Sequence, residues 1–424
     1  MLVAAPRKGS LDARHMTEHL EELTRLVDTA GAEVVGRIFQ HIATANPATL
    51  IGEGKVEEVG AAVAEAGATL VIFDDELSPV QGANLERELK VRVMDRSEVI
   101  LDIFSTRARS HEAKLQVELA QLEYLLPRLT RMWTHLSRIR GGIGLRGPGE
   151  TQLETDRRII RRRIQSLKVK LEGVERHREN LRAGRDPMLT VALVGYTNAG
   201  KSSILRSLSG QHDIVVEDRL FATLDTLTRE VDLGEGHRAR VTDTVGFIRK
   251  LPHHLVASFQ STLAEVQEAD ILLHVVDVSH SFAAEHIVVV RETLADIGAG
   301  GKPTVMVFNK IDRLANRNSI ASLRGQHHPA VFISATRGIN MTGLVSSITG
   351  LLEDAMATIT LTLNASHYPL LSRLHDESEI LEQRYEGEDI IVTIRTTRTE
   401  ADRLRQELGG PAKAPRPRRR VSKS

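Results

Sequence analysis

The chain has 424 residues, which corresponds to about three domains, and 41% of them are hydrophobic, enough for ordinary buried cores. It contains no cysteine, so disulfides, thiolate nucleophiles and cysteine-based zinc sites are excluded. Its 56 basic residues equal its 56 acidic residues, so the net charge points to no partner. The apolar run at the N-terminus is too short for a signal peptide and no stretch approaches the length of a membrane span, so we expect a cytoplasmic protein without membrane insertion.

Residues 1–105 alternate between strand-like and helix-like patterns. The strand-like runs cover residues 2–5, 33–40, 70–73 and 91–95, and the helix-like runs cover residues 12–29, 55–66 and 83–89. This alternation predicts a small α/β domain with a largely parallel sheet. The turn at residues 51–55 could bind an anion, but a plain tight turn before a helix is the favoured interpretation because the full phosphate-loop spacing is missing.

Residues 106–186 carry two runs of apolar residues in one heptad frame, which predict an antiparallel coiled helical hairpin. The first run consists of Leu115, Leu119, Leu122, Leu126, Leu129 and Trp133. The second run consists of Ile160, Ile164, Leu167, Leu171, Val174 and Leu181. Pro127 interrupts the first run, so we expect a kink or a short break near Leu126. The connection at residues 140–149 has five glycines and one proline, which predicts a mobile tip.

This hairpin arm is strongly basic, because residues 128–185 contain 16 Arg and Lys against six Asp and Glu. Several arginines converge on the tip end of the arm, namely Arg138, Arg140, Arg146, Arg157, Arg158, Arg161 and Arg162. A solvated basic helix face is the alternative interpretation. Convergence on the end of a projecting arm favours contact with a polyanion, above all RNA.

The most informative stretch lies in residues 187–354, where an apolar strand at 191–194 turns into a helix through the loop GYTNAGKS, residues 195–202. This strand–loop–helix pattern, with Gly195, Gly200, Lys201 and Ser202 in their places, predicts a nucleoside triphosphate site. The glycines let backbone N–H groups close around phosphate oxygens. Lys201 places a charge near the β- and γ-phosphates, and the Ser202 hydroxyl is suited to Mg²⁺.

Three further motifs follow strand-like runs in the same region. Asp243 of the DTVG motif, residues 243–246, is placed to hold the water shell of Mg²⁺, and Gly246 to meet the γ-phosphate. Asp312 of the NKID motif, residues 309–312, suits the N1–H and exocyclic amine of guanine, a donor pair that adenine lacks. The backbone of the SAT motif, residues 334–336, could read the guanine O6. Four motifs in this order, each at the carboxyl end of a strand-like run, predict a mostly parallel sheet that carries a guanine-specific GTPase site.

Residues 355–410 show a third pattern, with a strand at 359–363, a helix at 368–374, a hairpin of 379–385 and 389–396, and a helix at 400–408. This βαββα order predicts a small α+β domain. Residues 411–424 are rich in Pro, Arg and Lys and contain no acid, so we expect a disordered basic tail. The whole chain is therefore predicted to be a multidomain α/β protein.

Several of these segments together resemble the HflX family of ribosome-associated GTPases. They are the loop GYTNAGKS, the runs LFATLDTLTREVDL and DTVGFIRKLPHHLVASFQSTL, and the arm segment GGIGLRGPGETQLETDRRIIRRRI. The resemblance covers about residues 1–354. It implies a GTPase that uses Mg²⁺ to convert GTP and water to GDP and phosphate. It also implies binding to the large ribosomal subunit, with the arm inserted toward ribosomal RNA, to split or rescue stalled ribosomes; any association with membranes would be peripheral, through ribosomes.

The resemblance also assigns residues 221–225 to the first switch, with Thr223 as the second Mg²⁺-ligating hydroxyl beside Ser202. Relatives commonly read LDPT where this chain has LDTL at residues 224–227, and loss of the proline loosens the segment and makes Thr226 a weaker rival for the metal. The motifs and the resemblance together give the expected nucleotide-binding residues. They are Gly195, Tyr196, Thr197, Asn198, Ala199, Gly200, Lys201, Ser202, Phe221, Ala222, Thr223, Leu224, Asp225, Asp243, Thr244, Val245, Gly246, Asn309, Lys310, Ile311, Asp312, Ser334, Ala335 and Thr336.

Phe247 follows Gly246, where many small GTPases have the glutamine that orients the attacking water. Phenylalanine cannot do so, and two explanations stay open. Either a partner or a loop reorganised on the ribosome completes the site, as the resemblance implies, or another residue positions the water while Phe247 is only packed. We assign no catalytic base. We expect a monomeric, GTP-driven switch that acts mechanically on ribosomes. The alternative is a GTPase-gated factor for RNA processing or ribosome assembly.

Overall fold

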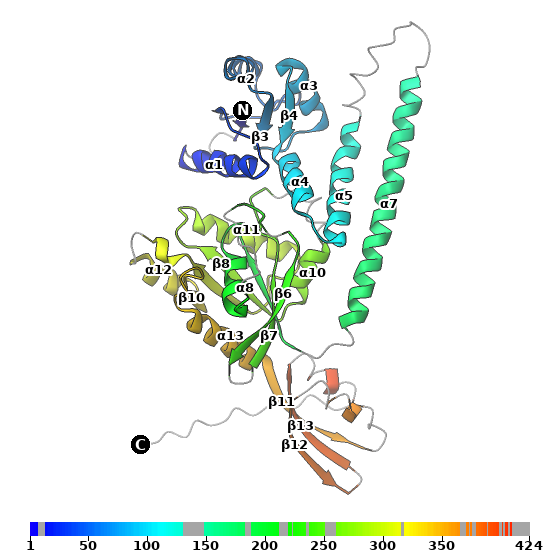
Figure 1. The fold of residues 1–424 in the computed structure, drawn as a ribbon, viewed down its shortest axis with the longest axis vertical. Coiled ribbons are helices and arrows are strands. Elements are labelled where there is room, and N and C mark those ends of the chain that lie inside the picture. The colour runs from blue at the N-terminus through cyan, green and yellow to red at the C-terminus, as the bar shows by residue number, and fades with distance from the viewer. Residues whose placement is uncertain are drawn as a thin grey trace.

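The structure is a computed structural model of the chain, in which an N-terminal domain, a helical arm, a central domain and a small C-terminal sheet follow one another (Figure 1). The arm runs along the side of the N-terminal and central domains, and the C-terminal sheet lies at the opposite end of the long axis from the N-terminal domain. The structure describes residues 1–6, 13–129, 148–182, 188–211, 219–222, 224–234, 237–250, 260–314, 318–364, 370–372, 374, 379–387, 389–397, 401, 403–405 and 408. None of the helices in these ranges is long and apolar enough to cross a membrane.

Four short parallel strands form the sheet of the N-terminal domain, in the order β2-β1-β3-β4. They are β1 (Leu2–Ala4), β2 (Arg37–Phe39), β3 (Leu70–Phe73) and β4 (Arg92–Asp95). Helices α1 (Ala13–Thr29) and α4 (Arg96–Arg107) contribute to one buried apolar cluster, and α2 (Glu53–Ala66) and α3 (Pro79–Leu89) to another. Because side chains alternate along a strand, Ile72 joins the first cluster and Val71 the second. The predicted α/β domain is confirmed, and α4 is a helix that the sequence patterns did not predict.

The arm consists of α5 (His111–Leu125) and α7 (Pro148–Arg182), and the chain rises along α5 and returns along α7 (Figure 1). Leu115, Leu119 and Leu167 are buried between the two helices, as the heptad pattern predicts. The predicted interruption is also present, since α5 ends before a short 3-10 helix, η1 (Leu126–Arg128), that contains Pro127. Trp133 and most of the predicted tip lie outside the described residues.

A buried arginine fixes the upper end of α5 to the N-terminal domain. The Arg128 guanidinium stacks 3.6 Å over the ring of Tyr124 and donates a 2.7 Å hydrogen bond to the carbonyl oxygen of Leu77. It also lies 3.3 Å from the carboxylate of Asp95. These contacts hold the upper end of α5 against the N-terminal domain.

The central domain has a six-stranded sheet in the order β10-β9-β8-β5-β7-β6. All neighbouring strands are parallel except β6 and β7. The strands are β5 (Thr190–Gly195), β6 (Leu227–Gly234), β7 (His237–Asp243), β8 (Ile271–Asp277), β9 (Thr304–Asn309) and β10 (Ala330–Phe332). The helical elements are α8 (Lys201–Ser209), α10 (Gln260–Glu268), α11 (Ala283–Asp296), η3 (Ile311–Arg313), α12 (Asn318–Gln326) and α13 (Met341–Ala355). The predicted mostly parallel sheet is confirmed, and its carboxyl ends carry the four motifs.

The C-terminal sheet is antiparallel, in the order β11-β13-β12. Its strands are β11 (Met356–Leu363), β12 (Glu379–Glu386) and β13 (Asp389–Thr397). Leu361 and Val392 lie opposite each other in the sheet, and together with Leu371 and Leu404 they belong to its buried cluster. This arrangement confirms the predicted small α+β domain, whereas residues 411–424 lie outside the described residues.

Buried charges join the N-terminal domain to the central domain. Arg96, at the start of α4, contacts Glu22 of α1 and lies 2.9 Å from Asp74, which follows β3. From the central domain, Arg249 lies 3.1 Å from Asp74, and the hydroxyl of Tyr196 donates to Glu22. Arg96, Glu22 and Asp74 are each less than 5% exposed, so the charges depend on one another rather than on water.

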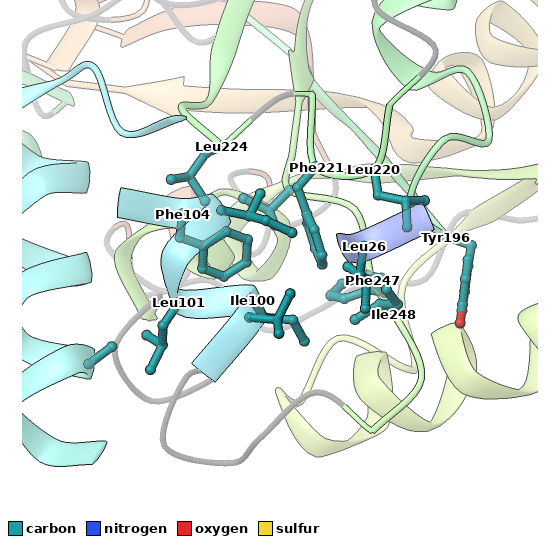
Figure 2. Packing of buried hydrophobic residues seen from close by; sticks show 14 of the residues in the cluster. Leu26, Ile100, Leu101, Phe104, Tyr196, Leu220, Phe221, Leu224, Phe247 and Ile248 are labelled. Carbon is teal, nitrogen blue, oxygen red and sulfur yellow. The ribbon is translucent and has the colours of Figure 1, made fainter. Parts of the chain in front are cut away.

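Apolar side chains from both domains pack around these charges. Figure 2 shows Leu26 and Ile100 of the N-terminal domain in the same cluster as Phe247 and Ile248 of the central domain. The two domains therefore share one continuous apolar core rather than a wet interface.

The buried carboxylates are held in their charged forms. Burial alone would raise the pKa of Asp74, but Arg249, Arg96 and Lys250 outweigh that effect and hold the pKa well below its usual range. Burial likewise favours a raised pKa for Glu22, and Arg96 and Arg249 reverse the shift. Folding lowers both pKa values. The two carboxylates therefore add their full contribution to the free energy of unfolding above the ordinary carboxyl pKa of about 4, and this contribution is lost as the pH falls through the lowered values.

Replacement of the central arginine tests the buried cluster. Arg96→Leu should lower the free energy of unfolding by about 3–5 kcal/mol, because Glu22 and Asp74 would stay buried without that partner. Arg92→Leu is the matched control, since Arg92 pairs with Glu98 at the surface and its loss should cost about 0–1 kcal/mol. The measurement is the midpoint of thermal and urea unfolding of the full chain. Equal losses in the two variants would contradict the assigned role of Arg96.

Candidate nucleotide-binding site

The loop between β5 and α8 is shaped by its glycines. Gly200 has a φ of 98°, in the region that favours glycine, and a Cβ at this position would lie 2.2 Å from the Nδ2 of Asn309. Gly200 also precedes the first residue of α8, whose N-terminus leaves backbone N–H groups available to an anion. The loop therefore has the geometry that its sequence predicts.

Lys201 is buried at the base of the loop. Its ammonium group donates to the carbonyl oxygens of Gly195 at 3.3 Å and Tyr196 at 3.2 Å. Burial lowers the pKa of Lys201 to about 8, although Asp243 opposes the shift. A polyphosphate beside the loop would supply negative charge to this buried cation and favour its protonated form.

Ser202 and Asp243 bring two oxygen donors together. The Ser202 hydroxyl donates a 2.6 Å hydrogen bond to the Asp243 carboxylate, which is fully buried at the end of β7. The parallel register of β5 and β7 pairs Leu193 with Asp243 and so sets this approach. Next to them, a Cβ on Gly246 would lie 2.6 Å from the Cα of Thr197, so a side chain there would collide with the loop. Hydroxyl and carboxylate oxygens are the hard ligands that Mg²⁺ prefers.

Asn309, at the end of β9, connects the phosphate end of the site to the base end. Its Nδ2 donates to the carbonyl oxygen of Ala199 at 3.0 Å, and its Oδ1 accepts from the backbone N–H of Ala335 at 3.1 Å. Lys310 next to it donates to the carbonyl oxygen of Asn198 at 2.8 Å and pairs with Asp277 at 2.8 Å. These contacts hold three separate motifs in one fixed arrangement.

A cavity of about 210 Å³ extends between the two ends. Eleven of the predicted nucleotide-binding residues line it: Thr197, Asn198, Gly200, Lys201, Ser202, Phe221, Ala222, Thr244, Gly246, Lys310 and Thr336. Three lining residues were not predicted, namely Ser203, Arg219 and Arg313. Ser203 and Arg313 directly follow predicted motifs. Arg219 lies just before the first switch, residues 221–225, which we call the switch segment. Proximity to a motif was therefore the signal available in the sequence.

The other predicted residues are placed in three ways. Gly195, Ala199, Asp243, Val245, Asn309, Ile311, Asp312, Ser334 and Ala335 belong to the strand ends and loops around the cavity. Tyr196, Leu224 and Asp225 contact the N-terminal domain or the arm instead. Thr223, Arg138, Arg140 and Arg146 lie outside the described residues, and Arg157, Arg158, Arg161 and Arg162 lie on α7, away from this cavity.

Phe247 is packed into the core shared by the two domains and is only 2% exposed. Its backbone N–H donates to the carbonyl oxygen of Gly195 at 3.0 Å, and its carbonyl oxygen accepts from Thr197 at 2.7 Å. The side chain thus turns away from the cavity, and its backbone braces the phosphate loop. Both explanations for the absent glutamine stay compatible with this packing.

Comparisons with known proteins relate the chain to GTPases. Family models match residues 17–105 ("GTP-binding GTPase N-terminal"), 107–185 ("GTP-binding GTPase Middle Region") and 190–310 ("50S ribosome-binding GTPase"). The GTPase HflX of Escherichia coli (strain K12) is 44% identical over 381 residues, which cover 89% of each chain. The GTPase HflX of Flavobacterium psychrophilum is 52% identical over 297 residues, which cover 70% of this chain and 71% of that protein. A solved GTP-binding protein of Sulfolobus solfataricus in complex with GDP is 26% identical, with 84% of this chain and 99% of that chain covered and a TM-score of 0.43.

The base end of the site makes a prediction about nucleotide choice. Asp312→Asn should shift preference from GTP toward xanthosine triphosphate, because an amide can donate to the extra carbonyl group of xanthine whereas a carboxylate cannot. Asp296→Asn, at an exposed position at the end of α11, is the matched control and should leave the preference unchanged. Competition binding with both nucleotides measures the effect. An Asp312→Asn variant that still prefers GTP would remove Asp312 from base recognition.

Proposed function

The chain belongs to the HflX family of GTPases, and on that premise we propose that it is a GTP-driven switch that binds the large ribosomal subunit and splits or rescues stalled ribosomes. GTP hydrolysis times the switch, and the arm reaches toward ribosomal RNA. The observation that carries the proposal is the arginine-rich part of α7, on a helix that runs along the side of the two domains (Figure 1).

The arginines have the exposure and spacing that phosphate contact requires. Helix α7 has 35 residues and is therefore about 52 Å long. Arg158, Arg161 and Arg162 are exposed, and their spacing of three and four residues places them on one face of the helix. Among the described residues, Arg163 pairs with Glu118 of α5, whereas none of these three arginines has an acidic partner within 4.0 Å. Their charges are therefore available to a polyanion.

The nucleotide site supports the GTPase half of the proposal. Backbone N–H groups at the start of α8 and the Lys201 ammonium would bind the phosphates, while Asp312 and the loop at Ala335 would read guanine. The Ser202 hydroxyl and the Asp243 carboxylate fit Mg²⁺, which when bound would neutralise charge that develops on the phosphates. We also propose Thr223 as a second hydroxyl for the metal. Because Phe247 is packed, the group that orients the attacking water would come from a partner or from a reorganised loop.

Charge reversal on the arm tests the proposal. Replacement of Arg157, Arg158, Arg161 and Arg162 by Glu should weaken binding to purified large subunits severely and flatten its salt dependence, since each lost phosphate contact removes about 0.7–0.9 from the slope of log affinity against log salt. GTP affinity should barely change, because the arginines lie on α7 and are not among the residues that line the cavity, and charge effects are screened beyond a Debye length of about 8 Å.

The matched control replaces the same four arginines by Lys, which keeps the charge and should keep most of the salt dependence. Subunit binding that is unchanged in the Glu variant would rule out α7 as the RNA-contacting element. Loss of GTP binding in the same variant would show a folding defect, which the unfolding midpoint would detect independently.

A further inference from the structure

The switch segment is attached to the base of the arm. The carboxylate of Asp225, the last residue of that segment, accepts hydrogen bonds from the backbone N–H of Arg109 at 3.0 Å and of Ser110 at 3.3 Å. It also accepts a 2.5 Å hydrogen bond from the Ser110 hydroxyl. Residues 109–110 immediately precede α5, the first helix of the arm, so a carboxylate from the central domain lies at the positive end of an arm helix.

Ser110 serves two partners at once. It is the N-cap of α5, and its hydroxyl oxygen accepts from the backbone N–H of Ala113 at 3.0 Å while the hydroxyl proton goes to Asp225. Each partner uses a different part of the hydroxyl, so both bonds form together. Substitutions at Ser110 can therefore separate the helix cap from the contact with Asp225.

The other end of the switch segment is fixed beside the phosphate loop. The backbone N–H of Phe221 donates a 2.8 Å hydrogen bond to the hydroxyl of Thr197, and Phe221 and Ala222 line the nucleotide cavity. The Phe221 ring packs edge-to-face on Phe104 of α4, with ring centroids 4.8 Å apart (Figure 2). The segment is thus held at the cavity by Phe221 and at the arm by Asp225.

We propose that Ser110 is a positioning residue for GTP hydrolysis, which acts through Asp225 to hold the switch segment near the phosphates. Only residues 222–224 separate the two attachment points, and the proposed metal ligand Thr223 is among them. Fixing both ends of so short a segment removes most of its alternative conformations, and the entropic cost of aligning a catalytic group falls accordingly.

This inference rests on GTPase activity and on the switch assignment, and it holds independently of any action on ribosomes. All its tests therefore use the full-length chain alone. Failure of these tests would leave the proposed ribosome function standing, and failure to bind ribosomes would leave this inference standing.

Ser110→Asp is the decisive variant. Aspartate is as good an N-cap as serine, but its carboxylate would face that of Asp225 and repel the switch segment. The single-turnover rate of GTP hydrolysis should fall about tenfold, while the affinity for GDP should stay within about twofold because GDP is held by the phosphate loop and the base motifs. Ser110→Thr keeps both hydroxyl bonds and should retain a rate within about twofold of the wild type.

Ser78→Ala is the matched control for loss of a helix cap. Ser78 is the N-cap of α3 and accepts from the backbone N–H of Gln81 at 3.1 Å, far from the switch segment. This variant should lose stability and keep its hydrolysis rate. Ser110→Gly provides a second test if Ser110→Asp does not fold. Glycine at an N-cap lowers stability by only a few tenths of a kcal/mol, and it removes the hydroxyl bond to Asp225. The hydrolysis rate of this variant should fall about threefold.

Amide hydrogen exchange supplies a readout that a purely structural serine would not change. Protection of the backbone N–H groups at Arg109 and Ser110 should differ between the GDP complex and a complex with a non-hydrolysable GTP analogue, and Ser110→Asp should abolish that difference. A folded Ser110→Asp or Ser110→Gly variant with a wild-type hydrolysis rate would overturn the proposal. A faster rate in either variant would also overturn it, because the contact would then restrain the switch rather than position it.

Discussion

The buried contact between Tyr196 and Glu22 is the constraint on which the rest of the structure depends. Tyr196 belongs to the phosphate loop, and Glu22 belongs to α1 of the N-terminal domain. Glu22 is held in its charged form by Arg96, and the Tyr196 hydroxyl also accepts a 2.9 Å hydrogen bond from the backbone N–H of Arg249. One side chain of the phosphate loop is thus buried against the neighbouring domain and hydrogen-bonded to it. Movement of that domain relative to the loop would leave buried charges without partners.

Two other segments of the nucleotide site have similar attachments. Residues 246–250 pass from the cavity to the N-terminal domain, where Lys250 lies 3.0 Å from Asp74. The switch segment contacts α4 through Phe221 and the start of α5 through Asp225. The 221–225 segment therefore ends on α4 and the start of α5, which lead into the arm, and residues 246–250 end on the N-terminal domain, to which Arg128 fixes α5. A local change at the nucleotide thus has a short physical route to the arm.

The sequence predicted the parts of the fold that follow from local patterns. Parallel strands end where the Asp243 and Asn309 motifs begin, and the heptad run correctly placed Leu115 and Leu167 in the arm interface. Helix α4 escaped prediction because it begins directly after β4, with Asp95 as both the last strand residue and the N-cap. The Glu22–Arg96 contact joins residues 74 positions apart, and no spacing rule indicates such a pair. Asp225 was expected at the nucleotide, but only the three-dimensional structure shows its carboxylate at the start of α5.

The central claim is that the nucleotide controls how this GTPase engages the large ribosomal subunit. Cosedimentation of the full chain with purified small and large subunits, in GDP or in a non-hydrolysable GTP analogue, tests it most directly. The chain should pellet with the large subunit in the presence of the analogue and much less in GDP, because only the analogue would place a γ-phosphate in the cavity that Phe221, Ala222 and Gly246 line. Equal binding with both nucleotides, or no binding to the large subunit at all, would contradict the account.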